Sequence, residues 1–332
     1  MEPEGRVKLA DVAELAGVSI ATVSKVVNGR YGVAAHTVAR VRRAIDELAY
    51  VPNLSASSLR SKSTGVLGFL VADFEPYAAE LMKGAARAAH GTQYELIAHA
   101  GGWSPGWERR SLARMGGTLV DGAVVATPTV QHASTAIPVV AVDPHYGPNQ
   151  VPTIDSDTFE GAREGTAYLL SLGHRRVAFI GGRKDLGTSR LREAGFRAAM
   201  KSAGVPVDES LIAYARYEPQ LAGEAARAML GVARPPTAIF VSNDVMAIRV
   251  IEVAQSLGVL VPEDLSVLGF DDVPEASMVP RGLTTVRQPL QAMGFAAMEM
   301  LLRLLRGEPG SEHVRMPTEL IVRGTCAPPR SV

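Results

Sequence analysis

The chain has 332 residues, of which 47% are hydrophobic and 20% are charged, and its formal net charge is zero. This length predicts two or three domains of roughly 100–200 residues each, and the composition is that of a folded globular protein rather than a disordered one. The charge is uneven, because residues 1–63 carry nine Lys and Arg against six Asp and Glu, whereas the remainder is mildly acidic. A mildly basic head is weak evidence for contact with phosphate.

The cellular location is indicated by what the sequence lacks. The single cysteine, Cys326, excludes an intramolecular disulfide and favours a reducing compartment. The opening residues, MEPEGRVKLADVAEL, place acidic side chains where a signal peptide has its apolar run. No apolar run approaches the roughly 18 residues that span a bilayer. We therefore expect a cytoplasmic protein with no membrane partner.

Residues 9–48 carry apolar side chains at helical spacing in three short segments. Gly17 is placed to end the first segment and Ser19 to cap the second. Two short helices joined by such a tight turn form the helix-turn-helix arrangement. The buried side of the second helix is expected to consist of valines, namely Val23, Val26 and Val27.

The opposite face of this second helix either reads a DNA major groove or forms an ordinary solvated surface. Its side chains are mostly small and uncharged: Ile20, Ala21, Ser24, Lys25 and Asn28. A purely solvated face would normally carry more Glu and Lys, so the composition favours the DNA-reading interpretation.

The pattern changes after residue 52. Residues 53–64, NLSASSLRSKST, form a polar, serine-rich linker, and from residue 65 short β-branched runs alternate with amphipathic helical segments. Such runs predict parallel strands covered by helices on both faces. The expected strands are 66–72, 94–100, 121–127, 137–143, 175–182, 237–244 and 265–272. Because they are too many for one sheet of usual size, we expect two α/β subdomains.

Several motifs follow one another in a specific order. The head contains LADVAELAGVSIATVSKVVNG and VRRAIDELAYVPN, and the body contains DSDTFEGAREGTAYLLSLGHRRVAFIGG, PTAIFVSNDVMAI, DLSVLGFDDVP and LTTVRQPLQAMG. Together they resemble the LacI–GalR family of bacterial transcription regulators over nearly the whole chain. The resemblance implies a fold with an all-α helix-turn-helix domain followed by a periplasmic-binding-protein-like domain of two α/β subdomains with parallel sheets.

The resemblance also implies domain boundaries. The DNA-binding domain would comprise residues 1–52 and the hinge linker residues 53–64. The effector-binding and dimerisation domain would comprise residues 65–332. Its N-subdomain is expected at about 65–157 and 288–317, and its C-subdomain at about 158–287 and 318–332.

In this family the protein binds a near-palindromic double-stranded DNA operator as a homodimer. The positions that match base-reading residues are Ile20, Ala21 and Lys25, and those that match phosphate contacts are Ser19, Thr22, Ser24, Asn28 and Thr37. Leu59 matches the leucine that inserts into the minor groove and kinks the duplex, in a linker that becomes helical on the operator. The side chains of Ile20 and Ala21 neither donate nor accept hydrogen bonds, so much of the hydrogen-bonded readout would rest on Lys25.

The body is expected to bind a small-molecule effector between its subdomains, where the carboxyl ends of the strands meet. Arg192, Asn243 and Asp271 match the family's effector-contacting positions. Their guanidinium, amide and carboxylate groups suit a ligand rich in hydroxyl groups, so a sugar is the default and a nucleobase the alternative.

Further candidates for effector contact lie near the predicted strand ends or near the match: Asp73, Tyr77 and Asp157. For Asp73 and Asp157, a helix-capping role is an equally good interpretation, and for Asp272 a structural role is favoured. Aromatic side chains that would either stack on a sugar ring or simply pack are Tyr77, Phe159, Phe196, Phe270, Trp103 and Trp107.

Two departures from the family pattern bear on function. EPYA (75–78) stands where the family often has NPFF, which alters the expected wall of the pocket. Ala34 and Val38 stand where a serine cap and an arginine are usual, which removes one cap and one phosphate contact. No leucine heptad follows ELIVRGTCAPP, so a dimer is favoured over a tetramer.

Two other function classes were weighed. A Rossmann-type enzyme is disfavoured because no G-x-G-x-x-G follows a strand, and FIGGRKDLG (179–187) has neither dinucleotide spacing nor a phosphate-binding Lys-Ser/Thr pair. A small-molecule-binding protein without DNA binding would suit the body but not the head. We expect no catalytic residues, no cofactor and no metal site.

Overall fold

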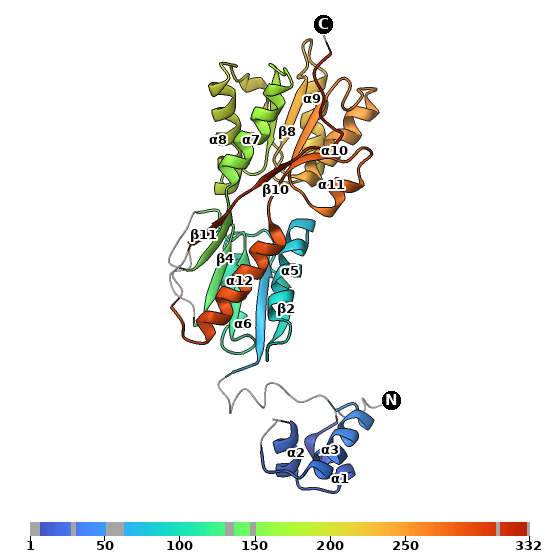
Figure 1. Cartoon of the computed structure of the whole chain (residues 1–332), viewed down its shortest axis with the longest axis vertical. Helices are drawn as coiled ribbons and strands as arrows, with labels where there is room; N and C mark the ends of the chain where they lie inside the picture. Colours follow the sequence, from blue (N-terminus) through green and yellow to red (C-terminus); the bar gives the residue numbers. More distant parts are fainter. Residues whose placement is uncertain are drawn as a thin grey trace. The chain divides into compact units, whose positions relative to one another are not determined.

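Figure 1 shows the computed structural model of the chain, which describes residues 7–27, 31–50, 63–129, 136–146, 151–309 and 313–330. Two compact units are present, Met1–Thr64 and Gly65–Val332. Among the described residues, no helix is long and apolar enough to cross a membrane.

The first unit contains three helices around a small core. They are α1 (Leu9–Ala16), α2 (Ile20–Val27) and α3 (Ala35–Glu47). Gly17 ends α1 in the left-handed conformation at φ 60°, which glycine adopts without strain, and the chain turns at once into α2. Val23 is fully buried, whereas Val26 and Val27 are only partly buried against the same core. The helix-turn-helix expected from the sequence is therefore formed.

The second unit contains two six-stranded sheets, seen one above the other in Figure 1. The first sheet is parallel throughout in the order β11-β5-β4-β3-β1-β2. Its strands are β1 (Val66–Val71), β2 (Glu95–Ala100), β3 (Gly122–Ala126), β4 (Val139–Val142), β5 (Thr153–Ser156) and β11 (His313–Met316). Helices α5 (Pro76–Ala89) and α12 (Leu290–Leu305) cover one face, and α6 (Trp107–Met115) covers the other.

The second sheet has the order β12-β10-β9-β8-β6-β7. Its strands are β6 (Val177–Gly181), β7 (Ile212–Tyr214), β8 (Ala238–Val241), β9 (Ser266–Asp271), β10 (Thr284–Arg287) and β12 (Glu319–Ile321). One face is covered by α7 (Thr158–Ser171) and α8 (Gly187–Ser202), the other by α9 (Pro219–Leu230) and α10 (Asp244–Ser256). The 3-10 turn η1 (Glu209–Leu211) precedes β7, and the short α11 (Pro274–Met278) follows β9.

The chain passes between the two sheets three times, from β5 to α7, from β10 to α12 and from β11 to β12. Glycines allow α5 and α12 to pack closely beside the first sheet: a Cβ atom on Gly84 would lie 1.9 Å from the carbonyl oxygen of Gln291, and one on Gly294 would lie 1.9 Å from that of Leu81. These two positions therefore exclude any side chain, and the pair of helices is held as one layer.

Two sequence expectations differ from the structure. The strand expected at 94–100 as a buried strand is instead the edge strand β2, whose residues are mostly exposed. The sheets were expected to be parallel, but β12 runs antiparallel to β10. The short β11–β12 connection explains this direction: a chain that leaves the carboxyl end of one sheet and enters the facing carboxyl edge of the other must run against its neighbours.

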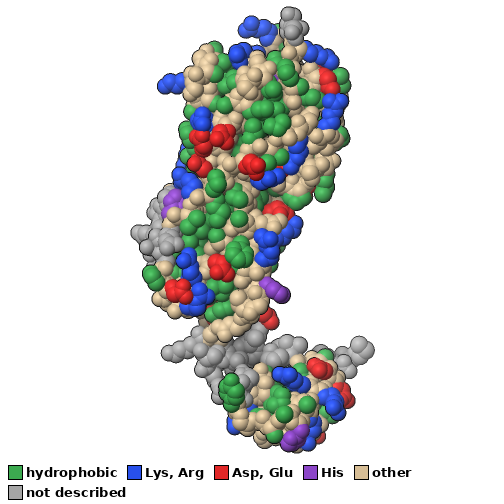
Figure 2. Space-filling model, in the orientation of Figure 1, with side chains coloured by type: hydrophobic (Ala, Val, Ile, Leu, Met, Phe, Trp, Pro, Cys, Tyr) green, Lys and Arg blue, Asp and Glu red, His purple; other side chains and the backbone are tan. Residues whose placement is uncertain are grey.

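The surface of the second unit carries both signs of charge. On the face shown in Figure 2, acidic and basic side chains are interspersed rather than gathered into one area of a single sign. This face therefore does not create the kind of extended single-sign field that attracts a polyanion. Candidate functions of the second unit depend instead on its interior.

Candidate functional site

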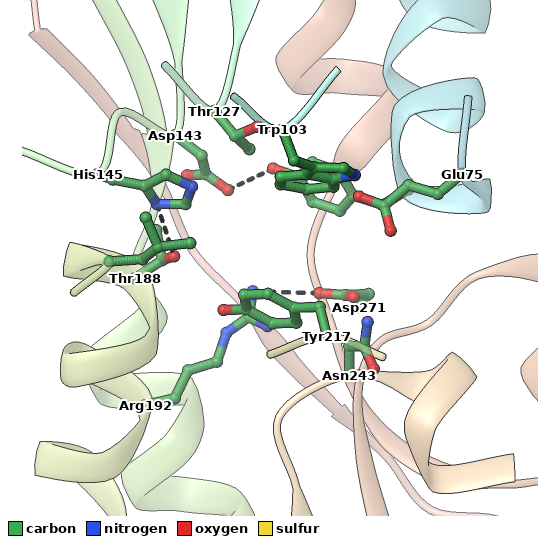
Figure 3. Close-up of a pocket in the computed structure, with 12 residues that line it drawn as sticks. Glu75, Trp103, Thr127, Asp143, His145, Thr188, Arg192, Tyr217, Asn243 and Asp271 are labelled. Atoms are coloured by element: carbon green, nitrogen blue, oxygen red, sulfur yellow. Dashed lines mark hydrogen bonds and ion pairs between the residues drawn. The ribbon is translucent and has the colours of Figure 1, made fainter. Parts of the chain in front are cut away.

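A pocket lies between the two sheets of the second unit (Figure 3). The side chains on the first-sheet side are Glu75, Tyr77, Trp103, Thr127, Asp143 and His145. Those on the second-sheet side are Leu186, Thr188, Arg192, Tyr217, Asn243 and Asp271. Each sheet thus contributes half of the lining.

The carboxyl ends of the parallel strands position these side chains. Thr127 directly follows β3, Asp143 follows β4, and Asp271 ends β9. Thr127, Asp143, Tyr217 and Asp271 also have positive φ values, of 48°, 47°, 64° and 112°. Such backbone is rare outside glycine and is often concentrated at binding sites, where the surrounding structure compensates for its strain.

The second-sheet wall is centred on a buried ion pair. The Arg192 guanidinium donates to Asp271 Oδ1 at 3.2 Å and to the Ser242 carbonyl oxygen, and it lies 4.1 Å from the centroid of the Phe270 ring. Burial raises the pKa of Asp271 to about 6, although Arg192 and a hydrogen bond from Gln288 oppose the rise. The Arg192 pKa also rises: burial lowers it, but Asp271, Tyr217, Asp143 and Tyr77 together outweigh burial.

A chain of hydrogen bonds connects the two walls. Tyr77 Oη donates to Asp143 Oδ2 at 2.5 Å, and Asp143 Oδ1 accepts from the Ser156 amide at 3.3 Å. The Ser156 hydroxyl donates to Gln288 Oε1, and Gln288 Nε2 donates to Asp271 Oδ1 at 2.7 Å. Ser156 ends β5 and Gln288 follows β10, so this chain passes through two of the three connections between the sheets.

The two subdomains also meet directly at His145. Its carbonyl oxygen accepts from the Gly187 amide at 2.9 Å, and its Nδ1 lies 3.0 Å from Thr188 Oγ1 at the start of α8. Burial lowers the pKa of His145 to about 3, and the positive charges of Arg192 and Arg183 lower it further. His145 is therefore neutral at physiological pH and serves as a hydrogen-bonding group rather than a charge.

Glu75 differs from the other acidic side chains of the pocket. It directly precedes α5 but makes no capping hydrogen bond with that helix. Burial raises the pKa of its carboxyl to about 7, and the nearby carboxylates of Asp271 and Asp73 raise it further, while Arg192 opposes the rise. Protonated and ionised forms of Glu75 therefore coexist near neutral pH.

In the first unit, α2 presents its outer face to solvent. Ile20 is 53% exposed, and Ala21 and Lys25 are also exposed. Ser19 Oγ accepts from the Thr22 amide at 3.2 Å and lies 2.9 Å from Thr22 Oγ1, so Ser19 caps α2 as the sequence predicts.

Two known domain families match the two units. The model of bacterial regulatory proteins of the lacI family matches residues 8–53, and that of the periplasmic binding protein-like domain matches residues 166–326. A curated relative, the HTH-type transcriptional regulator DegA of Bacillus subtilis (strain 168), is 34% identical over 329 residues, covering 96% of this chain and 97% of DegA. The chain belongs to the LacI family.

Solved structures of other transcription regulators share this fold. The transcriptional regulator CelR in complex with cellobiose is 30% identical with a TM-score of 0.73, covering 96% of this chain and all of CelR. The lac repressor dimer bound to operator and the anti-inducer ONPF is 27% identical with a TM-score of 0.83, covering 97% of this chain and all of that chain. This LacI-family chain is a ligand-responsive DNA-binding transcriptional regulator and not an enzyme.

Of the effector contacts expected from the sequence of this LacI-family member, four line the pocket: Tyr77, Arg192, Asn243 and Asp271. Asn243 has a second task, because its Oδ1 accepts from the Met246 amide at 3.0 Å and caps α10. The pocket thus brings together two of the side chains expected at strand ends, Asn243 and Asp271, with Arg192 from α8.

The other two expected contacts are not among the lining residues. Asp157 caps α7, accepting from the Glu160 amide at 3.3 Å. Asp73 is exposed and accepts from the Phe74 amide at 2.7 Å. Asp272, for which a structural role was favoured, binds two arginine side chains. For Asp157 the geometry is that of a helix cap.

Among the aromatic candidates, only Tyr77 and Trp103 line the pocket. Three others are buried in the hydrophobic interior: Trp107, Phe196 and Phe270. Phe159 is 36% exposed and is not a lining residue.

Sequence reasoning missed several lining residues of this LacI-family pocket. Thr127 and Asp143 end predicted strands, so the rule that selected Asp271 would have selected them too. Glu75 lies within the EPYA departure, which was noted without assigning the residue a role. His145 and Tyr217 follow short irregular connections, and nothing in the sequence pattern points to them.

The expected DNA contacts lie on the first unit where they are described. Thr37 and Ser24 are partly buried, on α3 and α2. Ala34 precedes α3 without a side-chain capping bond, as the departure at this position predicts. Asn28, Leu59 and nearly all of the 53–64 linker lie outside the described residues.

Proposed function

We propose that this LacI-family regulator is a repressor that binds a near-palindromic operator as a homodimer. A small polyhydroxylated molecule, a sugar, controls its DNA affinity from the pocket between the two sheets, and the protein acts in the cytoplasm. One observation carries the effector half of this proposal: charged and amide side chains from both sheets converge on one cavity, with the buried Arg192–Asp271 pair at its centre.

A ligand in this pocket has a direct way to affect distant parts of the chain. It contacts both subdomains, so it stabilises whichever relative arrangement places the two walls at the right separation. The hydrogen-bond chain through Ser156 and Gln288 joins the walls at the connections between the sheets, where such a rearrangement would bend the chain. Control of DNA binding then requires different effector affinities in the two arrangements.

The sugar assignment is supported by chemistry and by relatives. Amide, hydroxyl, carboxylate and guanidinium groups can each bond to neighbouring hydroxyl groups, and the rings of Tyr77, Trp103 and Tyr217 offer faces for a sugar ring. CelR is named in complex with cellobiose, and the lac repressor is described with the anti-inducer ONPF. The polar lining of the pocket and the ligands named for these two similar proteins make a carbohydrate the first class to test.

For DNA reading, we propose that Ile20, Ala21 and Lys25 face the bases and that Ser19, Thr22, Ser24, Asn28 and Thr37 hold phosphates. Lys25 is the exposed cation on the outer face of α2, and a lysine there can donate to guanine O6 and N7. Leu59 is proposed to insert into the minor groove between two half-sites. The lac repressor dimer bound to its operator supports a dimeric arrangement.

The experiment that tests DNA reading selects sequences from a random DNA pool with the full-length protein. We expect a near-palindrome, and we expect Lys25→Ala to lose discrimination at one base pair in each half-site, worth about 1–3 kcal/mol. Lys201→Ala is the matched control, because this exposed lysine lies on α8 in the other unit. Selection of no common sequence by the wild type would reject the operator-binding function, and an unchanged preference in Lys25→Ala would reject the role of that residue.

A further inference from the structure

The Glu75 carboxylate is a pocket group that the family's motifs do not account for. Residues that start a helix usually cap it with a short side chain, and Glu is too long to do so well. In this chain the Glu75 side chain leaves α5 uncapped and extends into the pocket, on the same side as Trp103 (Figure 3). Among the described residues, no hydrogen bond or ion pair to the Glu75 carboxylate is formed.

The other charged groups of the pocket each have a partner, although Arg192 Nε is buried without an acceptor in the described part of the chain. Arg192 is paired with Asp271, and the Asp143 carboxylate accepts from the Tyr77 hydroxyl and the Ser156 amide. His145 is neutral, so Arg192 is the single permanent cation among the lining residues, against three carboxylates. The pocket therefore has an excess of negative charge. Of its three carboxylates, Glu75 is the one without a partner within the described residues. Glu75 is partly buried, so its carboxylate is partly removed from water and remains open to a charged group of a ligand.

The groups around Glu75 define the rest of the ligand. The ring of Trp103 lines the same side of the pocket, and an aromatic face attracts a cation as well as the apolar face of a sugar ring. Across the pocket, Asn243 is only 6% exposed and uses its Oδ1 to cap α10, while its amide nitrogen points toward the cavity in Figure 3. That nitrogen is an unpartnered donor for a hydroxyl oxygen.

We propose that the effector is an amino sugar, a polyhydroxylated ring whose protonated amine binds the carboxylate of Glu75 while its hydroxyl groups bind the opposite wall. This inference rests on the proposed function, because it names the ligand class of the same pocket. Near neutral pH, binding of the cation draws Glu75 into its ionised form, so the complex releases a proton whenever Glu75 was protonated beforehand.

The test is isothermal titration of the full-length protein with matched pairs of sugars at pH 7. The pairs are D-glucosamine with D-glucose, D-galactosamine with D-galactose, and the diamine of chitobiose with cellobiose, each accompanied by the N-acetylated amine, which is neutral. We expect at least one amine to bind ten-fold or more tightly than its parent and its N-acetyl form. The Glu75→Gln variant should lose that preference, while Glu224→Gln, an exposed change on α9, should keep it.

A second measurement is the pH dependence of amine binding, which reports the ionisation of Glu75. Glu75 has a pKa of about 7, so lowering the pH from 7 to 6 should weaken binding of the amine to the wild type roughly five-fold. Asp271 lines the same pocket, has a pKa of about 6 and is present in both proteins, so the wild type should weaken by about this factor more than Glu75→Gln does. A binding constant for the wild type that does not change between pH 6 and 7 contradicts the ion pair.

Three results overturn the amino-sugar assignment: a parent or N-acetyl sugar that binds as tightly as its amine, an amine preference that survives in Glu75→Gln, or no binding by any amine in the panel. Binding of the selected DNA is measured on the same preparations. A protein that binds DNA but no amine overturns this ligand class alone, whereas a protein that binds no DNA overturns the proposed function.

Discussion

The two walls of the pocket differ in how far their polar groups are matched before any ligand arrives. On the second-sheet wall, Arg192, Asp271 and Asn243 each make a hydrogen bond within the protein, although Arg192 Nε is buried without an acceptor among the residues described. On the first-sheet wall, Asp143 is matched by Tyr77, but Glu75 makes no hydrogen bond or ion pair within the described part of the chain and Trp103 is 42% exposed. The second-sheet wall is preorganised before a ligand binds, whereas the first-sheet wall can distinguish one ligand from another.

This difference agrees with the sequence. Arg192, Asn243 and Asp271 occupy positions that match the family, whereas Glu75 lies within a departure from it. A preorganised set of donors and acceptors binds any polyhydroxylated ligand with little reordering, so it gives affinity without much choice. A group whose partner must come from the ligand rejects ligands that lack one, so it provides specificity.

The largest effect on stability is expected from removing the Arg192–Asp271 ion pair of the second-sheet wall. Arg192→Met leaves the Asp271 carboxylate buried without its cation, and loss of one partner of a buried pair costs roughly 3–5 kcal/mol. Urea unfolding should therefore show a loss of about this size in the free energy of unfolding of the second unit. Arg190→Ala, an exposed change two residues earlier on α8, is the control. A loss below 1 kcal/mol for Arg192→Met would show that the wall is not organised by this pair.

On the first-sheet wall, the substitution Glu75→Gln is expected to raise the free energy of unfolding rather than lower it. The folded-state pKa of Glu75 lies above its unfolded value of 4.5, at about 7, so between these values the folded protein binds more protons than the unfolded one. Glu75 therefore lowers stability as the pH rises from about 4.5 to 7. At 1.4 kcal/mol per pKa unit, Glu75→Gln should be more stable than the wild type at pH 8 by at most roughly 3.5 kcal/mol.

This difference should shrink to about 0.4 kcal/mol at pH 4.5, where the carboxyl is protonated in the folded state and half protonated in the unfolded state. Thermal unfolding of both proteins across pH 4.5–8 measures it, and other raised carboxyls such as Asp271 cancel because both proteins contain them. Parallel curves for the two proteins would mean that Glu75 is solvated like an ordinary surface glutamate, and the contrast between the walls would weaken.

A smaller effect is expected from Tyr77→Phe, which removes the hydroxyl that donates to Asp143. A hydrogen bond to a charged group contributes about 1.5–3 kcal/mol, so unfolding should become easier by about 2 kcal/mol. Tyr94→Phe serves as a control, because that tyrosine is only partly buried and lies beside the edge strand β2. Equal losses of stability in Tyr77→Phe and Tyr94→Phe would show that the hydrogen bond from Tyr77 to Asp143 does not stabilise the first-sheet wall.

The smallest effect on stability is expected at Asn243. Asn243→Ala removes the cap of α10 and should cost about 1 kcal/mol, whereas Asn243→Asp keeps an acceptor for the Met246 amide and should retain most of that stability. Both variants lose the amide donor toward the pocket, so both should bind a sugar more weakly. Undiminished sugar binding by Asn243→Asp would show that the residue is a cap only.

The sheets could be predicted from the sequence because buried parallel strands are continuous apolar runs, as in β1, β3 and β4. Edge strands carry a weaker signal. β2 was recognised as a strand, but its exposure depends on its place in the sheet order, which local pattern does not encode. The direction of β12 likewise depends on which edge of the sheet the chain enters after β11.

The site was predictable where a side chain directly ends a strand or matches a family motif, as for Asp271 and Arg192. It was not predictable for His145 and Tyr217. Tyr217 lies in a loop with φ 64°, and that left-handed turn, rather than the residue's place in the chain order, directs its ring into the pocket. Loop conformations of this kind depend on tertiary contacts that sequence periodicity does not contain.

The backbone contact between His145 and Gly187 can report whether the two subdomains are together or apart. A Cβ atom on Gly187 would lie 2.2 Å from the His145 carbonyl oxygen, so two backbones meet with no side chain between them to stretch or adapt. Separation of the two subdomains at this point lengthens the 2.9 Å bond from the Gly187 amide. The rate of hydrogen exchange at the Gly187 amide therefore reports the fraction of time for which the two subdomains are apart at this contact.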